Sequence, residues 1–303
     1  MPTLIVVTGP TGSGKTELAT SLARRLGCEI ISADSRQIYR DIPIGTAAPT
    51  EEQLKAVPHH FIGRLELDQY YSAAQFEAEA METLGKLFAQ NEYAIMCGGS
   101  MMYIDAVTNG IDQLPTISEE VRRQAYELYN TGGPEAIRSK LKELDPEYYG
   151  IVDLCNHKRI IHAIEITLEA GVPFSSLRTG QKKQRPFSVL KFAINHDRET
   201  LFARINSRVD AMIEAGLEQE ARSVYHLRHL NSLNTVGYKE MFAMFDGTMD
   251  RDTAISRLKK NTRVYAKKQL TWLKRDESVI WLDAENALEQ ALKRIKSLSH
   301  NIC

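Results

Sequence analysis

Eight residues near the start of the chain have the types and spacing to bind phosphate. They follow the pattern G-x-x-x-x-G-K-[ST] of a P-loop and comprise Gly9, Pro10, Thr11, Gly12, Ser13, Gly14, Lys15 and Thr16. The glycines let backbone N–H groups turn inward around a phosphate, Lys15 reaches a phosphate oxygen, and Thr16 reaches a Mg²⁺ ion. A chance glycine-rich turn is a poor alternative, because an apolar, β-branched run at 4–8 precedes the motif and a helical pattern at 16–26 follows it. We expect this loop to bind a phosphorylated ligand.

Asp34 is the acidic residue best placed to act beside that ligand. It follows a second short predicted strand, 29–32. The carboxyl ends of parallel strands share the sheet edge where a P-loop lies, so Asp34 should lie near the phosphate. A simple polar turn remains an equal alternative for the residues around Asp34.

The next predicted strand, 93–97, ends in Gly98-Gly99-Ser100. The two glycines predict either a tight turn or a close approach of the backbone to a ligand. P-loop ATPases and kinases hold Mg²⁺ with a second acid at such a strand end, but here Gly98 occupies that place. The motif therefore favours a phosphate cradle over nucleotide hydrolysis. A cradle for diphosphate as a leaving group would use the same backbone N–H groups, Lys15, Mg²⁺ on Thr16 and nearby arginines.

The elements that position these residues alternate between strand and helix only in parts of the chain. From about 116 to 185 the sequence predicts helices alone, capped at Ser118 and Asn156. Residues 40–70 and 233–240 are predicted as loops, and 197–215 and 252–275 as helices. We expect an α/β fold in which a P-loop NTPase-like parallel sheet core, residues 1–115 and 186–303, carries an all-helical insertion domain at 116–185.

The composition excludes several classes of protein. With a net charge of −1 over 303 residues, a nucleic-acid site must be local. The widely spaced cysteines, Cys28, Cys97, Cys155 and Cys303, argue against a zinc ribbon and for a reducing compartment. The pair His59-His60 lacks further ligands at metal spacing. No apolar run reaches membrane-spanning length, and no signal peptide precedes the first strand. We expect a cytoplasmic monomer without a membrane partner.

One segment does carry a local positive charge. Residues 257–275 contain eight Lys or Arg and no acid, with Lys267 and Lys268 among them. A charge run is usually a solvated helix face. Eight charges of one sign in a balanced chain indicate contact with a polyanion.

Six segments together resemble the tRNA isopentenyltransferase family, the bacterial tRNA dimethylallyltransferases. In order they are 9–16, 34–39, 44–47, 98–103, 236–240 and 266–273. The DSRQ-x-Y and QLTWL segments are the most specific, and the set spans nearly the whole chain. The resemblance implies transfer of a dimethylallyl group from dimethylallyl diphosphate to N6 of adenosine 37 of tRNA. It further implies that the helical insertion grips the anticodon stem-loop and that the adenine is flipped into a channel.

The resemblance also implies roles for single residues. Asp34 would be the general base and Ser100 a second catalytic residue, while Arg208 would join the P-loop at the diphosphate. The implied tRNA contacts are Asp34, Ser35, Arg36, Gln37, Gly98, Lys158, Arg159, Ile160, Ile161, His162, Lys267 and Lys268. Ser100 and His162 depart from the family pattern, which usually has threonine and arginine there. Serine keeps the hydroxyl, whereas histidine weakens one RNA contact or makes it depend on pH.

Two other functions compete with this interpretation. A nucleotide or small-molecule kinase could use 116–185 as a lid, but it would need the missing strand-end acid. A non-catalytic RNA-binding switch could sense nucleotide through the P-loop, but it would not need Asp34 there. The sequence leaves open which tRNAs are accepted and whether ATP also binds.

Overall fold

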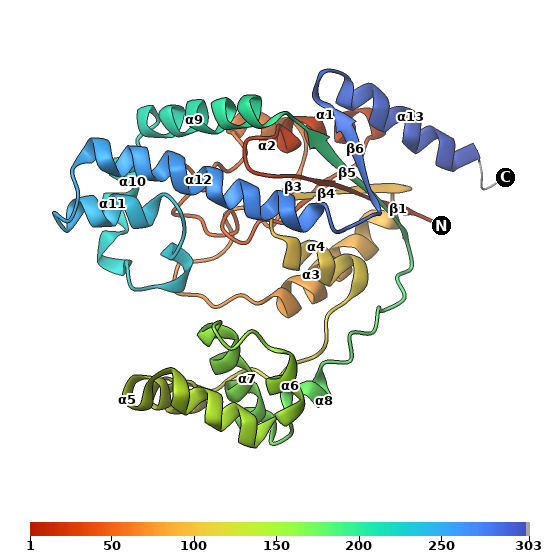
Figure 1. Ribbon diagram of the computed structural model, residues 1–303. Helices are drawn as coiled ribbons and strands as arrows, with labels where there is room; N and C mark the ends of the chain where they lie inside the picture. The colour runs from red at the N-terminus through yellow and green to blue at the C-terminus, as the bar shows by residue number, and fades with distance from the viewer. Residues whose placement is uncertain (301–303) are drawn as a thin grey trace. The chain divides into compact units, whose positions relative to one another are not determined.

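The computed structural model describes residues 1–300, which form two compact units. Unit 1 joins Met1–Thr108 to the chain from Arg185 onward, and unit 2 is the insertion Asn109–Gln184 (Figure 1). No helix among the described residues is long and apolar enough to cross a membrane. Cys28, Cys97 and Cys155 are free thiols, and Cys303 lies outside the described residues.

Unit 1 is built on a six-stranded parallel sheet in the order β3-β2-β4-β1-β5-β6. The strands are β1 (Thr3–Thr8), β2 (Ile30–Ser32), β3 (His59–His60), β4 (Tyr93–Gly98), β5 (Ser188–Asn195) and β6 (Val279–Asp283). Thr8 pairs with Gly98, and Ser32 pairs with Cys97. The central strands therefore end level with one another, which brings the P-loop, Asp34 and the Gly98-Gly99 pair to one edge.

Helices cover both faces of this sheet, and its central strands β1 and β4 are mostly apolar. Ile5 and Val7 of β1 face the core beneath α1 (Lys15–Leu26) and α13 (Ala287–His300). Leu4 and Val6 face the opposite core, beneath α3 (Ala73–Phe88) and α4 (Met101–Asn109). Figure 1 shows these two helix layers on either side of the strands.

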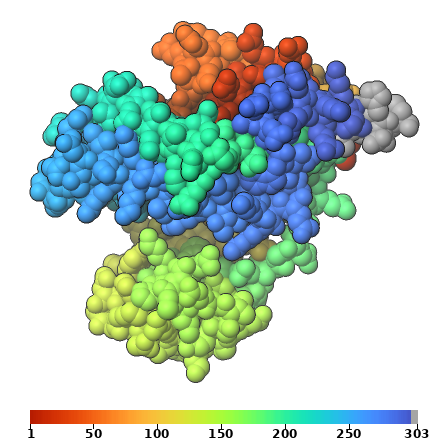
Figure 2. All heavy atoms as spheres, turned by 45° about the horizontal axis from the view of Figure 1, so that its top comes forward, coloured from red at the N-terminus to blue at the C-terminus, as the bar shows by residue number. Residues whose placement is uncertain are grey.

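Four further helices build a wall beside the carboxyl edge of the sheet: α9 (Arg198–Glu214), α10 (Leu217–Ser223), α11 (Tyr238–Phe245) and α12 (Arg251–Leu273). Helices α9 and α12 run antiparallel. The Lys259–Asp210 ion pair, at 2.6 Å, lies at one end of their contact, and Lys267 lies over the ring of Phe202 at the other. Figure 2 shows the teal and blue atoms of these helices side by side.

The structure corrects two loop predictions. Residues 238–240 begin α11 rather than continuing a loop, because the carboxylate of Glu240 accepts a hydrogen bond from the N–H of Gly237 at 2.7 Å and caps the helix. Within 40–70 lie the short helix α2 (Glu51–Ala56), capped by Thr50, and the edge strand β3. Both are too short to give a periodic sequence signal.

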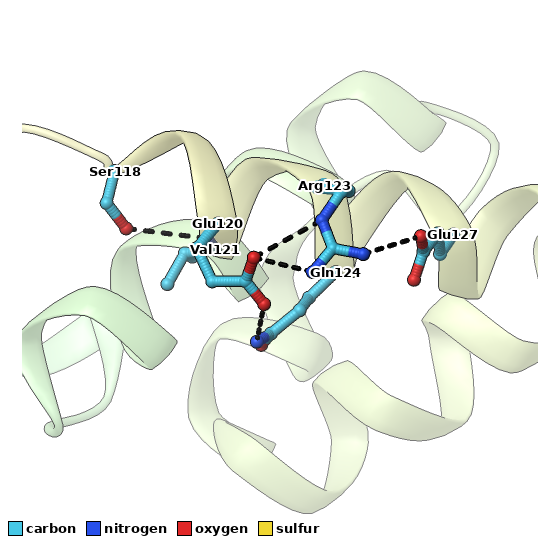
Figure 3. Close-up of polar contacts among 6 residues, drawn as sticks. All are labelled: Ser118, Glu120, Val121, Arg123, Gln124 and Glu127. Atoms are coloured by element: carbon cyan, nitrogen blue, oxygen red, sulfur yellow. Dashed lines mark hydrogen bonds and ion pairs between the residues drawn. The ribbon is translucent and has the colours of Figure 1, made fainter.

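Unit 2 is all helical, with α5 (Glu119–Leu144), α6 (Pro146–Ile151), α7 (His157–Ala170) and α8 (Phe174–Leu177). Ser118 caps α5, and Glu120 and Glu127 bond Arg123 along its exposed face (Figure 3). Gly133 interrupts α5 with a φ of 67° and a ψ of −164°. The unit begins at 109 rather than 116, because Leu114 already packs on its core.

The two chain segments that enter and leave unit 2 meet at their roots. The N–H of Lys183 donates to the carbonyl of Asn109 at 2.8 Å. In unit 1, Nη2 of Arg185 donates to Glu77 Oε1 and to the carbonyl of Ala106, both at 2.6 Å. Arg185 thus ties the returning chain to α3 and α4. The remaining elements are single 3₁₀ turns, η1 (Tyr225–Leu227), η2 (Asn231–Leu233) and η3 (Ala284–Asn286).

Candidate active site

A cavity of about 340 Å³ lies at the carboxyl edge of the sheet in unit 1. Three groups of residues line it: the P-loop, the segment after β2, and the helices α9 to α12. The lining includes Thr11, Lys15, Thr16, Asp34, Ser35, Arg36, Gln37, Gly45, Thr46, Arg208, Met212, Leu217, Asn234, Thr235, Gly237, Lys239, Leu258, Tyr265 and Gln269. A second hollow of about 560 Å³ shares Lys15, Thr16 and Arg208 with the first. These three residues therefore face both spaces.

The P-loop holds its shape through glycine and through contacts with α9. Gly12 has a φ of 82°, and a Cβ there would lie 2.9 Å from Cγ1 of Ile205. Nε of Arg204 donates to the carbonyl of Gly12 at 2.8 Å. A larger residue at 12 would thus be strained and would also push α9 away.

Positive charge is concentrated between the loop and α9. Burial lowers the pKa of Lys15, and the neighbouring Arg208 lowers it further, while Asp34 acts in the opposite direction. Burial likewise lowers the pKa of the Arg208 guanidinium, which Asp34 partly offsets. Two buried cations lie close together here, with one carboxylate nearby. A bound polyanion would stabilise their charged forms.

The strand-end residue Asp34 is oriented by the backbone. Its Oδ1 accepts hydrogen bonds from the N–H groups of Arg36, at 2.9 Å, and Gln37, at 3.3 Å. Within residues 1–300 its Oδ2 accepts no hydrogen bond, and the residue lines the cavity. The carboxylate is thus held in place with one oxygen left to bind a ligand.

Three residues predicted to touch tRNA have structural partners instead of free side chains. Nη1 of Arg36 donates to the carbonyls of Asn231 and Ser232, each at 3.0 Å. Nε2 of Gln37 donates to the carbonyls of Thr46 and Ala47. These bonds tie η2 and the 44–47 loop to the Asp34 segment. Ser35 also lines the cavity, and its N–H is bound by Ser100.

Ser100 and Gly98 lie off the cavity wall. Ser100 Oγ accepts the N–H of Ser35 at 2.9 Å and donates to its Oγ at 3.1 Å. A Cβ on Gly98 would lie 2.1 Å from the carbonyl oxygen of Ala33. Gly98 is therefore required for contact between β4 and the chain after β2, and the Ser100 hydroxyl holds Ser35.

Gln269 is the site residue that the sequence interpretation did not select. Its Oε1 accepts the N–H of Thr11 and its Nε2 donates to the carbonyl of Gly99, each at 3.0 Å. A Cβ on Gly99 would lie 2.5 Å from this Nε2. One buried side chain on α12 thus clamps the P-loop to the end of β4. The only sequence signal was its place at the head of the QLTWL segment.

Glu220 was missed as well. Its carboxylate accepts the N–H groups of Ile44, at 2.7 Å, and Gly45, at 2.8 Å, together with the hydroxyl of Tyr238, at 2.5 Å. Burial and this carboxylate raise the pKa of the Tyr238 phenol. The three bonds fix the 44–47 loop, whose Gly45 and Thr46 line the cavity. No local sequence pattern distinguishes Glu220 from Glu218 on the same helix α10.

The other predicted tRNA contacts divide by exposure. On α7 in unit 2, Lys158, Arg159 and His162 are exposed, whereas Ile160 and Ile161 are buried in the helical core. The two isoleucine side chains therefore pack in the helical core, and Ile161 also lines a surface hollow beside Lys158. His162 packs near Phe174, and its Nδ1 lies 3.6 Å from Glu165. On α12 in unit 1, Lys267 and Lys268 are exposed.

The end of β4 carries no acid. Cys97 there bonds the hydroxyl of Thr16, and burial raises the pKa of its thiol to about 11, so it stays neutral. No group of three His, Cys, Asp or Glu residues within 1–300 could hold a metal. Mg²⁺ commonly binds through one or two protein oxygens plus substrate phosphates. The hydroxyl of Thr16, together with the oxygens of a diphosphate, therefore fits Mg²⁺ that arrives with that diphosphate.

Comparison with known proteins identifies the family. The IPP transferase family model matches residues 37–276. The chain belongs to this family. It is 52% identical over 301 residues to tRNA dimethylallyltransferase 1 of Bacteroides thetaiotaomicron, covering 99% of this chain and 98% of the relative. It is 54% identical to the enzyme of that name from Bacteroides fragilis, covering 95% of each chain.

Solved structures agree with this assignment. The tRNA isopentenylpyrophosphate transferase of Bacillus halodurans is 33% identical, with a TM-score of 0.72 over 99% of this chain and 96% of that one. A eukaryotic dimethylallyltransferase whose structures capture it acting on tRNA has a TM-score of 0.85 at 25% identity, over 99% and 80% of the two chains. The P-loop NTPase-like fold expected from the sequence is confirmed.

Proposed function

We propose that this IPP transferase moves a dimethylallyl group from dimethylallyl diphosphate to N6 of adenosine 37 in the anticodon loop of tRNA. The observation that carries the proposal is that one cavity is lined by Lys15 of the P-loop, by Arg208 of α9 and by the backbone-held carboxylate of Asp34. Such a cavity has a place for the leaving group and a place for the base that activates the nucleophile.

The diphosphate would lie on the P-loop, against Lys15 and Arg208, with Thr16 holding Mg²⁺. When bound, the ion neutralises charge on the phosphates. Lys15 and Arg208 take up the charge that develops as the C1–O bond breaks. Burial is the main cause of the lowered pKa of both cations, and Arg208 lowers that of Lys15 further, so a bound diphosphate would offset the cost of burying these charges.

Asp34 would act on the other side of the reacting carbon. The N6 amine of adenine is a weak nucleophile, because its lone pair is delocalised into the ring. It gains strength as a proton leaves, and the Oδ2 oxygen of Asp34 can accept that proton. N6 then bonds to C1 and the diphosphate departs. Burial raises the pKa of the Tyr265 phenol near Asp34, so this cavity residue stays neutral and keeps an O–H that can donate a hydrogen bond.

The two alternative functions, a kinase and a nucleotide-sensing RNA-binding switch, explain fewer of the site residues. A kinase would need the strand-end acid in place of the neutral Cys97-Gly98 end of β4. A binding switch would give Asp34 no role. Incubation with unmodified tRNA and radiolabelled dimethylallyl diphosphate separates all three: label in the RNA, dependent on Mg²⁺ and without ATP turnover, supports the proposal. Background labelling together with tRNA-stimulated ATP hydrolysis would overturn it.

A further inference from the structure

The P-loop is held from outside by two side chains of the segment that follows β5. Nε2 of His196 lies 2.9 Å from the carbonyl oxygen of Ser13, and Nε of Arg204 donates to the carbonyl of Gly12 at 2.8 Å. Because a carbonyl oxygen can only accept, Nε2 of His196 carries the proton of its hydrogen bond. Two consecutive carbonyls of the P-loop are therefore fixed by donors that lie outside the loop.

The register of the sheet places His196 beside the P-loop. Thr8, the last residue of β1, pairs with Ala193 of β5. The chain of β5 thus continues for three residues past the point where β1 gives way to the P-loop, and the third of them is His196. Asp197 then caps α9 by accepting the N–H of Thr200 at 2.8 Å, which fixes the turn that carries the imidazole.

A carbonyl that is fixed also fixes the N–H of the same peptide unit. The peptide plane is rigid and trans, so the carbonyl of one residue and the N–H of the next point in opposite directions. The hydrogen bond from His196 to the carbonyl of Ser13 therefore turns the N–H of Gly14 away from His196. Ser13 itself is only 1% exposed, which leaves this peptide little freedom to rotate.

The two fixed peptides differ in what their N–H groups bind. The peptide held by Arg204 presents the N–H of Ser13, which donates to the carbonyl of Pro10 at 3.2 Å and closes the loop on itself. The N–H of Gly14 has no acceptor among residues 1–300. Gly14 lines the second hollow together with Lys15. Of the two N–H groups, that of Gly14 is thus the one free to bind a ligand.

We propose that His196 is a positioning residue that directs the N–H of Gly14 toward the departing diphosphate. This inference rests on the proposed function and adds to it a residue that acts on the leaving group without touching it. His196 lines neither the active-site cavity nor the second hollow, so it acts through the peptide that joins Ser13 to Gly14.

The same hydrogen bond makes the Gly14 N–H a stronger donor. Hydrogen bonds that share a peptide polarise one another, so a carbonyl that accepts a proton draws electron density away from its own N–H. As the C1–O bond breaks, negative charge develops on the diphosphate oxygens. An N–H group that is already oriented stabilises this charge without rearrangement. His196 thus favours both the binding and the departure of the diphosphate.

The test uses inorganic diphosphate with Mg²⁺ as the probe, because its binding needs neither tRNA nor the dimethylallyl group. We expect His196→Ala to raise the Kd by roughly 10-fold or more, the scale of one hydrogen bond to a charged group. His196→Gln should restore most of the affinity, since its amide N–H reaches about as far as Nε2 of the imidazole. His196→Asn, which is one methylene shorter, should bind as weakly as His196→Ala.

The transfer reaction gives a second measurement. With tRNA saturating, the KM for dimethylallyl diphosphate should rise in the same order among the three variants, and the KM for tRNA should not change. His59→Ala is the matched control, since His59 is also half-buried and its Nδ1 donates to a backbone carbonyl, that of Val57, at 2.8 Å on the edge strand β3. Its Kd and KM values should equal those of the wild type, whatever its thermal stability.

Two results would overturn the positioning role and leave dimethylallyl transfer intact. One is a folded His196→Ala protein whose Kd and KM for the diphosphates match those of His59→Ala. The other is a His196→Gln protein that binds as weakly as His196→Asn, because the imidazole would then act other than by its hydrogen bond. A wild type that neither binds diphosphate nor labels tRNA would overturn the proposed function, and this inference with it.

Discussion

The cavity has a strand-end wall, which carries Asp34, Ser35 and Gln37, and a helix wall, which carries Arg208 and Met212. On the strand-end wall the polar side chains bond the backbone: Asp34 accepts two N–H groups, and Gln37 donates to two carbonyls. On the helix wall Arg208 makes a single long bond, 3.5 Å to Ala47, and Met212 packs against the hydrophobic core.

This difference separates two tasks. Proton transfer depends on a carboxylate placed within hydrogen-bond reach, so the group that accepts the proton is fixed by the chain around it. Binding a flexible allylic chain and a diphosphate calls for side chains that can adjust, and long unbranched groups such as Met and Arg do so. We therefore expect substitutions on the strand-end wall to lower the rate of chemistry, and substitutions on the helix wall to change binding and selectivity.

The largest effect should come from Asp34→Ala. Loss of the base should lower single-turnover prenyl transfer roughly 10²-fold or more, with both substrates saturating. Binding of each substrate and thermal stability should stay near wild type. A variant that folds, binds both substrates and still transfers at nearly the wild-type rate would show that Asp34 is not the base.

Gln269→Ala tests the two hydrogen bonds through which Gln269 on α12 clamps the P-loop to the end of β4. It leaves the N–H of Thr11 and the carbonyl of Gly99 without their partner and frees the P-loop from β4. Because misplacement by about 1 Å can cost up to 100-fold, we expect kcat/KM to fall roughly 10- to 100-fold. Gln290→Ala is the control, since Gln290 also bonds a backbone N–H, that of Asp283, but on α13. Equal activity of the two variants would remove the clamp from the mechanism.

Much of this site could be predicted from the sequence, and the limit is physical. The P-loop and Asp34 follow strands, and the shared edge of a parallel sheet brings strand ends together without any knowledge of packing. Gln269 and Glu220 act over sequence separations that no local pattern records, since Gln269 bonds Thr11 and Glu220 bonds Gly45.

The roles of predicted residues were harder to foresee than their location. Arg36 and Gln37 look like exposed RNA-binding groups in sequence, but they hold backbone carbonyls. Ile160 and Ile161 lie in a segment predicted to touch RNA, but helical periodicity turns them into the core of unit 2. Gly98 is required by the close approach of Ala33, a packing role that the sequence did not indicate.

Glu220→Gln should have a moderate effect, because an amide accepts fewer hydrogen bonds than a carboxylate and leaves one of three donors without a partner. We expect the free energy of unfolding to fall by about 1 kcal/mol and KM for the diphosphate to rise several-fold as the 44–47 loop loosens. Glu218→Gln, two residues away and paired with Arg251 at the surface, is the control for both measurements. A normal KM with lowered stability would make Glu220 purely structural.

The smallest effect should come from the outer face of the helix wall. Lys267→Ala with Lys268→Ala should weaken tRNA binding and reduce the slope of log affinity against log salt by roughly 1 to 2, as expected for two lost phosphate contacts. Dimethylallyl diphosphate binding should not change. The paired control is Lys293→Ala with Lys296→Ala, two exposed lysines on α13. If both double variants keep the wild-type slope, α12 is not part of the tRNA interface.

The hydrogen bond between Lys183 and Asn109 has a consequence for how such a chain could arise. Because the insertion leaves and returns at one point, a chain of any length can occupy that point without moving a strand of the sheet. The entropy of closing a loop grows only by about 0.6 kcal/mol for each doubling of its length, so a whole folded module costs the sheet little more than a turn. The surface exposed on unit 2 can thus diverge between lineages while the chemistry of unit 1 stays fixed.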